Sequence, residues 1–120
     1  MSSPHLIEQI KKLGLNQNEA RVYLALLELH KGTVSEISQK AQMNRTTGYD
    51  ILERIALYGL ANRTLKEGGK NKRVYTAEPP SRLKQYLENK KHAAEQRLEK
   101  LPDILPDLQS LYKSELKPSI

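Results

Sequence analysis

Two short helical segments joined by a tight polar turn constrain the fold of this chain more than any other feature. Residues 33–41 carry apolar side chains at helical spacing, and residues 42–44 form a polar turn. A second helix is predicted over residues 45–58, with Gly59 ending it. A short helix, a tight turn and a second helix at this spacing form a helix-turn-helix, the unit that places its second helix in the major groove of DNA.

A basic hairpin is predicted directly after the second helix. Residues 61–65 and 72–77 read as strands around the turn at Gly68 and Gly69. Residues 60–77 carry five positive and one negative side chain, so four of the six net positive charges fall in this segment. An isolated hairpin of this kind is equally well a solvated loop, but after a helix pair it indicates a polyanion partner. The predicted fold is mainly α with a small β-hairpin: a winged helix-turn-helix followed by a long C-terminal helix.

The segment before residue 33 is predicted to form two helices. Ser3 and Pro4 suit the start of the first helix, whose apolar stripe includes Leu6, Ile10 and Leu13. Asn16 and Glu19 form a capping box at the start of the second helix. That helix is apolar on nearly every side up to Leu29, which predicts a buried central helix, ended by residues 30–32. With no Phe or Trp in the chain, the predicted core is aliphatic.

The helix-turn-helix carries its own start signals. Thr33 and Glu36 form a further capping box, and Asn44 is the predicted N-cap of the second helix. That helix has one face with small or apolar side chains and an opposite polar face. The first face holds Gly48, Ile51, Leu52 and Ile55, and the second holds Thr46, Tyr49, Asp50 and Glu53. A Gly inside a helix costs roughly 0.5–1 kcal/mol relative to Ala, so Gly48 suggests that another helix packs closely there.

A long amphipathic helix is predicted at the C-terminus, after Pro79, Pro80 and the capping residue Ser81. Its apolar side chains recur every seven residues in two rows, which is typical of a coiled-coil seam. Pro102 and Pro106 interrupt the seam, so we expect a kink or a break near Leu101. The residues predicted to mediate dimerisation are Leu87, Ala94, Leu98, Leu101, Leu105, Leu108 and Tyr112.

The start of the second helix of the pair carries the most specific chemistry. Arg45 can bond the O6 and N7 atoms of guanine or grip a phosphate, and Thr46 and Thr47 can bond a phosphate, touch a thymine methyl or simply cap the helix. Asp50 and Glu53 repel phosphates, so we expect them to be solvent-exposed or paired with Arg54. The predicted DNA-binding residues are Thr33, Ser35, Asn44, Arg45, Thr46, Thr47, Tyr49, Arg54, Lys70, Asn71, Lys72 and Arg73.

Other classes of site have little support in the sequence. There is no Cys, and the three His are scattered with no carboxylate at metal-ligand spacing, so we expect no metal, no cofactor and no enzymatic activity. No apolar run approaches the roughly 20 residues that span a bilayer, and the N-terminus lacks the features of a signal peptide. We therefore expect no membrane association and a cytoplasmic location.

Two segments resemble a known family. Residues 13–27 (LGLNQNEARVYLALL) and 43–54 (MNRTTGYDILER) are similar to those of the TrmB-like winged-helix transcriptional regulators of archaea and bacteria, as is the hairpin ending in Arg73, Val74 and Tyr75. The resemblance covers roughly residues 6–112. It implies a dimeric DNA-binding regulator whose recognition helix begins near Arg45. Gly48 departs from the family, which usually has a larger apolar residue there.

The resemblance leaves the extent of the protein open. Family members with a sugar-binding effector domain carry it after the helical linker, about where this chain ends. The chain is either a short member or the N-terminal piece of a longer regulator, and its effector is not predicted.

The leading hypothesis is a sequence-specific regulator that binds double-stranded DNA as a homodimer. Its recognition helix, about residues 45–58, would enter the major groove, and its wing, residues 61–77, would contact the backbone or minor groove. The alternative is a winged-helix protein-interaction subunit of a larger assembly, although such a subunit needs no cluster of positive charge. We assign residues 1–79 to a winged-helix DNA-binding domain and 80–120 to a helical dimerisation or linker segment.

Overall fold

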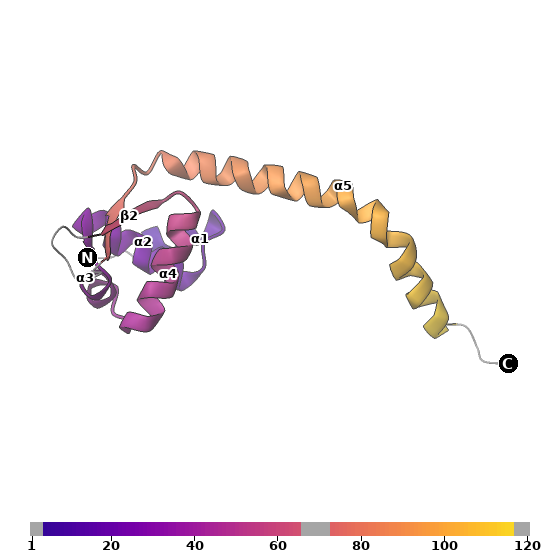
Figure 1. Cartoon of the computed structure of the whole chain (residues 1–120), viewed down its shortest axis with the longest axis horizontal. Coiled ribbons are helices and arrows are strands. Elements are labelled where there is room, and N and C mark those ends of the chain that lie inside the picture. Colours follow the sequence, from indigo (N-terminus) through magenta and orange to yellow (C-terminus); the bar gives the residue numbers. More distant parts are fainter. Residues whose placement is uncertain (1–3, 66–72, 117–120) are drawn as a thin grey trace. The chain divides into compact units, whose positions relative to one another are not determined.

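The computed structural model describes residues 4–65 and 73–116 and contains five helices and three strands in this part of the chain (Figure 1). Residues up to Tyr86 form one compact unit, and residues from Leu87 onward form a second. The helices are α1 (Pro4–Lys12), α2 (Gln17–Leu29), α3 (Val34–Lys40), α4 (Arg45–Leu57) and α5 (Arg82–Leu116). The strands are β1 (Lys31–Thr33), β2 (Ala61–Leu65) and β3 (Arg73–Ala77).

Three of the predicted helix starts, those of α2, α3 and α4, are confirmed by their capping hydrogen bonds. The side chain of Asn16 accepts a hydrogen bond from the backbone N–H of Glu19 at 2.8 Å, and the Glu19 carboxylate accepts one from the backbone of Asn16 at 2.9 Å. Thr33 caps α3 in the same reciprocal way. The Asn44 side chain accepts from the backbone N–H of Thr47 at 2.8 Å and caps α4. These bonds satisfy N–H groups that a helix leaves without an internal partner.

The sheet has one more strand than the sequence predicted. The hairpin of β2 and β3 is present, and β1 adds to it, giving the antiparallel order β1-β3-β2. Residues 31 and 32 were predicted only to end α2, but Gly32 lies opposite Tyr75 in the register of β1 and β3. The strand escaped prediction because three residues are too few to show a period of two.

The core of the first unit is built mainly on α2, as predicted for a helix that is apolar all round. Its side chains from Val22 to Leu26 are all buried, and they meet Ile37 of α3 and the inward face of α4. The expectation of an aliphatic core was only partly right. Tyr23, Tyr75 and Tyr86 are also buried, so tyrosine supplies the large side chains that Phe or Trp would otherwise provide.

Gly48 brings α3 and α4 into close contact, as the sequence suggested. A Cβ atom at position 48 would lie 1.8 Å from the Oγ atom of Ser38 and 2.9 Å from its Cβ atom. Ser38 itself is buried, and its hydroxyl has no hydrogen-bond partner among the described residues. The absence of a side chain at Gly48 therefore sets how closely the two helices of the helix-turn-helix can pack.

The sequence predicted a kink or a break in the C-terminal helix, and the structure has no break, because α5 continues through both Pro102 and Pro106. Figure 1 shows one uninterrupted helix that changes direction in its second half, as a proline kink requires. Each proline removes one backbone hydrogen bond, leaving the carbonyls four residues earlier, at Leu98 and Pro102, without that donor. Both residues are exposed, so water can satisfy their carbonyls and the helix is maintained.

We predict that Gly48→Ala lowers the free energy of unfolding by about 1–3 kcal/mol, because the added methyl group forces α3 and α4 apart. This loss outweighs the roughly 0.5–1 kcal/mol that Ala contributes through helix propensity. Denaturant titration followed by circular dichroism measures the change. Ser38→Ala is the matched control and should leave stability unchanged or raised, since it removes a buried hydroxyl that lacks a partner among the described residues. A Gly48→Ala variant as stable as the wild type would contradict the close packing.

Candidate nucleic-acid interface

The turn between α3 and α4 is held from outside by α2. The Arg21 guanidinium donates hydrogen bonds to the backbone carbonyls of Ala41 and Gln42, the second at 3.1 Å. Gln42 has a φ of +59°, a left-handed conformation that a non-glycine residue adopts only when its surroundings favour it. Lys40 at the end of α3 also pairs with Glu28 of α2 at 3.1 Å. Sequence analysis missed Arg21, because nothing in a local pattern links it to a turn twenty residues away.

The start of α4 presents polar side chains to solvent. Arg45 and Thr46 are exposed and Thr47 is half-buried. Asn44 supplies the helix cap, so capping is not the role of the two threonines. Among the described residues, Arg45 makes no ion pair or hydrogen bond. Its guanidinium is therefore available for a ligand at the N-terminal end of the helix, where the helix dipole favours anions.

The start of α3 differs from that of α4. The Thr33 hydroxyl accepts a hydrogen bond from the backbone N–H of Glu36, and the Glu36 carboxylate accepts one from Thr33. An anion approaching here would meet the Glu36 carboxylate close to the free N–H groups. Ser35 is exposed. For a phosphate, the start of α4 is therefore electrostatically more favourable than the start of α3.

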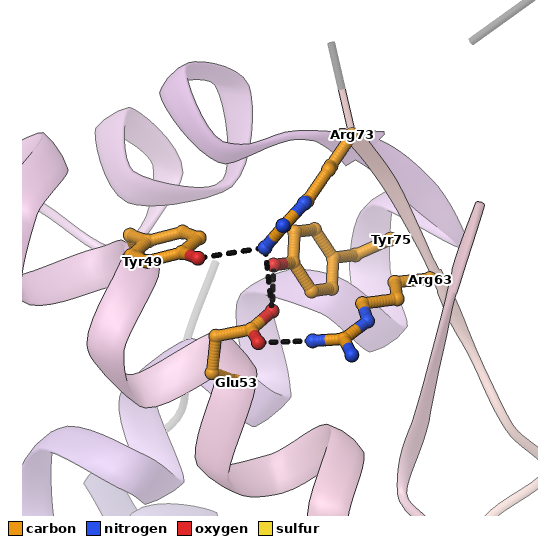
Figure 2. Close-up of polar contacts among 5 residues, drawn as sticks. All are labelled: Tyr49, Glu53, Arg63, Arg73 and Tyr75. Carbon is orange, nitrogen blue, oxygen red and sulfur yellow. Dashed lines mark hydrogen bonds and ion pairs between the residues drawn. The ribbon is translucent and has the colours of Figure 1, made fainter. Parts of the chain in front are cut away.

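Tyr49 and Arg73 connect the recognition helix to the wing. Arg73 lies at the start of β3 and donates a hydrogen bond of 2.6 Å from Nη1 to the Tyr49 hydroxyl (Figure 2). Its guanidinium carbon lies 5.6 Å from the centroid of the Tyr49 ring, within the range of a cation–π interaction. Two residues predicted separately as DNA contacts are thus joined in one surface.

Glu53 lies at the centre of this contact. It accepts hydrogen bonds from Arg63 of β2 at Oε1 and from the Tyr75 hydroxyl of β3 at Oε2, and its Oε2 atom lies 3.6 Å from Nη1 of Arg73 (Figure 2). We call Tyr49, Glu53, Arg63, Arg73 and Tyr75 the Glu53 cluster. The prediction that Glu53 is solvent-exposed or paired with Arg54 is wrong, since both its oxygens bind the wing strands.

Ionisation in the Glu53 cluster follows from these contacts. The hydrogen bond from Arg63, with smaller help from Tyr75 and Arg73, lowers the pKa of Glu53 despite its partial burial. Its contribution to stability is therefore present at neutral pH and is lost only as the pH falls through the lowered pKa. Burial, and then the hydrogen bond to Glu53, raise the pKa of Tyr75 to about 12, so Tyr75 remains a neutral donor.

Arg54 lies against α2 and is not part of the Glu53 cluster. Its Nη1 atom is 3.6 Å from Oε2 of the buried Glu19, which also accepts a hydrogen bond of 2.8 Å from the Tyr58 hydroxyl. Burial and this hydrogen bond raise the pKa of Tyr58 to about 12. Arg54 therefore neutralises a buried carboxylate, and the structure does not bring it together with Arg45 or Tyr49. Asp50 is exposed on α4.

The remaining predicted site residues lie elsewhere. Lys70, Asn71 and Lys72 fall outside the described residues. The seven predicted dimerisation residues all lie on α5 and are all exposed, with Leu98 at 70% and Tyr112 at 66%. Ile104 and Leu111 are exposed on the same helix and were not part of the predicted seam.

Residues 4–65 and 73–116 contain neither a cluster of metal ligands nor a membrane-spanning helix. No group of three or more acidic or His side chains there is arranged to hold a metal ion. Within the same residues, no helix is both long and apolar enough to cross a membrane.

Solved structures share this fold. The archaeal chromatin protein TrmBL2, whose structure is described as showing a novel mode of DNA binding, is 20% identical with a TM-score of 0.71, over 99% of this chain and 44% of that one. YusO from Bacillus subtilis is 17% identical with a TM-score of 0.56, over 96% of this chain and 84% of that one. A MarR family regulator from Silicibacter pomeroyi is 18% identical with a TM-score of 0.53, over 93% of this chain and 77% of that one. At these identities the likeness shows the winged-helix fold alone.

Sequence comparison identifies the family. No curated protein matches this chain significantly in sequence. The family described as "Sugar-specific transcriptional regulator TrmB" matches residues 10–81, more than half of the chain. The match spans the helix-turn-helix and both wing strands, whereas the chain covers less than half the length of TrmBL2. This winged-helix chain belongs to the TrmB family of transcriptional regulators.

Proposed function

We propose that this chain binds double-stranded DNA sequence-specifically as a homodimeric transcriptional regulator. Helix α4 would lie in the major groove, and the wing would contact the backbone or the minor groove. One observation carries the proposal: the exposed Arg45 at the start of α4 belongs to the helix whose Tyr49 is bonded to Arg73 of the basic wing. This link supports a shared role for α4 and the wing, in which α4 would read bases and the wing would hold the backbone.

The proposed contacts divide into two kinds. Arg45, Thr46 and Thr47 would contact base edges, because the first turn of a recognition helix enters the groove. The others would hold phosphates and fix the position of the protein without specifying sequence: Thr33, Ser35, Asn44, Tyr49, Lys70, Asn71, Lys72 and Arg73. Arg54 is the weakest of the predicted contacts, since its charge already neutralises Glu19.

The homodimer would form through α5. Leu98, Leu101, Leu105 and Leu108 are each 37% exposed or more, and they repeat at coiled-coil spacing. Pairing with a second copy buries them, at roughly 1.5–3 kcal/mol per fully buried leucine. We therefore propose that residues 80–120 serve dimerisation while residues 1–79 bind DNA.

Selection of bound sites from random DNA tests the proposal directly. Repeated enrichment at near-physiological salt should yield an inverted repeat with half-sites about one helical turn, or a multiple of it, apart. The selected site should then resist competition by random DNA in a mobility-shift assay. Failure to select any sequence would favour the alternative, a winged helix that binds protein within a larger assembly.

Arg45→Ala should weaken binding to the selected site by about 1–3 kcal/mol and change binding to random DNA much less, because only base contacts distinguish the two. Fluorescence anisotropy with both DNAs measures the difference. Asp50→Ala, on the next turn of α4, is the control for truncation of an exposed side chain there. Equal losses on both DNAs with Arg45→Ala would reduce Arg45 to a phosphate contact.

Neutralising Lys70 and Lys72 together to Gln should weaken binding to every sequence. The slope of log affinity against log salt should fall by roughly 0.9 for each phosphate that the variant no longer neutralises. Replacing Lys11 and Lys12 of α1 by Gln removes the same charge from a helix to which we assign no DNA contact. Equal slopes for the wild type and the Lys70 and Lys72 variant would show that the wing does not touch DNA.

Leu98→Asp combined with Leu105→Asp should give folded monomers with much weaker operator binding, since charge at the seam opposes pairing and a monomer engages only one half-site. Analytical ultracentrifugation at tens of micromolar gives the oligomeric state. Gln96→Asp with Ser110→Asp adds the same charge off the predicted seam and should remain dimeric. A monomeric wild type would refute the homodimer.

A further inference from the structure

Glu53 is in an unusual position for an acidic residue. It lies on α4, the helix proposed to face DNA, where an unpaired carboxylate would repel phosphates. Both of its oxygens are instead bound by residues of the wing. Arg63 approaches from β2, and Tyr75 and Arg73 approach from β3, so a single carboxylate joins α4 to both strands of the hairpin (Figure 2).

We propose that Glu53 is a positioning residue for DNA binding, which holds the base of the wing on the recognition helix so that both elements meet DNA in a fixed geometry. The inference rests on the proposed function and deepens it. A recognition helix and a wing contribute together to one site only if their separation matches that of the groove and the backbone. Any freedom between them has to be lost on binding and weakens the specific complex.

Charge in the Glu53 cluster supports this role. Two guanidinium groups and one carboxylate leave the cluster with a net positive charge, so it attracts phosphate although it contains an acid. The side chains of Arg63 and Arg73 are 50% and 41% exposed, while that of Glu53 is 26% exposed. A guanidinium has five N–H donors, so an arginine bonded to Glu53 retains donors for a phosphate. Glu53 thus orients two arginines and remains partly shielded behind them.

Asp50 provides an internal comparison. It lies on α4 three residues before Glu53, is exposed, and makes no ion pair or hydrogen bond with any residue in the described ranges. If acids on this surface act only by repelling DNA, removing either charge should strengthen binding. If Glu53 positions the wing, the two substitutions should have opposite effects on the specific site.

The test compares Glu53→Gln with Asp50→Asn, each of which removes one negative charge. Affinity is measured for the selected site and for random DNA, and thermal unfolding confirms that both variants are folded. Asp50→Asn should strengthen binding to both DNAs by about twofold, the effect of one screened charge. Glu53→Gln should weaken binding to the selected site by about tenfold, the worth of one charged hydrogen bond, and leave random DNA unchanged or slightly better bound. Strengthened binding to both DNAs by Glu53→Gln would overturn the proposal.

If Glu53→Gln does not fold, a second variant tests whether the Glu53 cluster positions the wing. Arg63→Gln leaves the bonds of Glu53 to Tyr75 and Arg73 in place. If Arg63 acts by positioning the wing, the variant should lose more affinity for the selected site than for random DNA. If Arg63 only contacts a phosphate, the variant should lose the same affinity for both DNAs. The equal loss would refute the inference. A wild type that selects no DNA sequence would refute the proposed function itself, and this inference with it.

Discussion

The close approach of α3 and α4 at Gly48 is the constraint on which the rest of this surface depends. A side chain at this position would collide with Ser38, so the two helices pack closely only because the position carries none. Arg21 then holds the intervening turn from α2, including the left-handed Gln42. With the inner face of α4 fixed in this way, its first turn, beginning at Arg45, is left in solvent.

Features that depend on neighbouring residues could be predicted from the sequence, and features that depend on distant residues could not. The caps at Asn16, Thr33 and Asn44 involve partners three residues away, within a recognisable local pattern. The bond from Tyr58 to Glu19 spans 39 residues, and that from Tyr75 to Glu53 spans 22. The helical and strand repeats in the sequence do not relate residues so far apart, because such pairs form only when helices and strands pack together.

In the candidate site too, the features set by neighbouring residues were predicted and those set by distant residues were not. Helical periodicity placed Thr46 and Tyr49 opposite Ile51 and Leu52, and the structure has the first pair exposed and the second pair buried. Charge alone suggested that Glu53 would be exposed to solvent or paired with Arg54. In the folded chain it is bound instead by Arg63 of β2 and by Tyr75 and Arg73 of β3.

The beginning of α5 belongs to the first unit and is held there by tyrosine packing. Tyr86 is buried in the first unit, and its ring centroid lies 5.0 Å from that of Tyr58, which follows α4. Tyr58 in turn bonds Glu19, which also pairs with Arg54 of α4. Within the first unit, the start of α5 is therefore packed against the residue that follows α4.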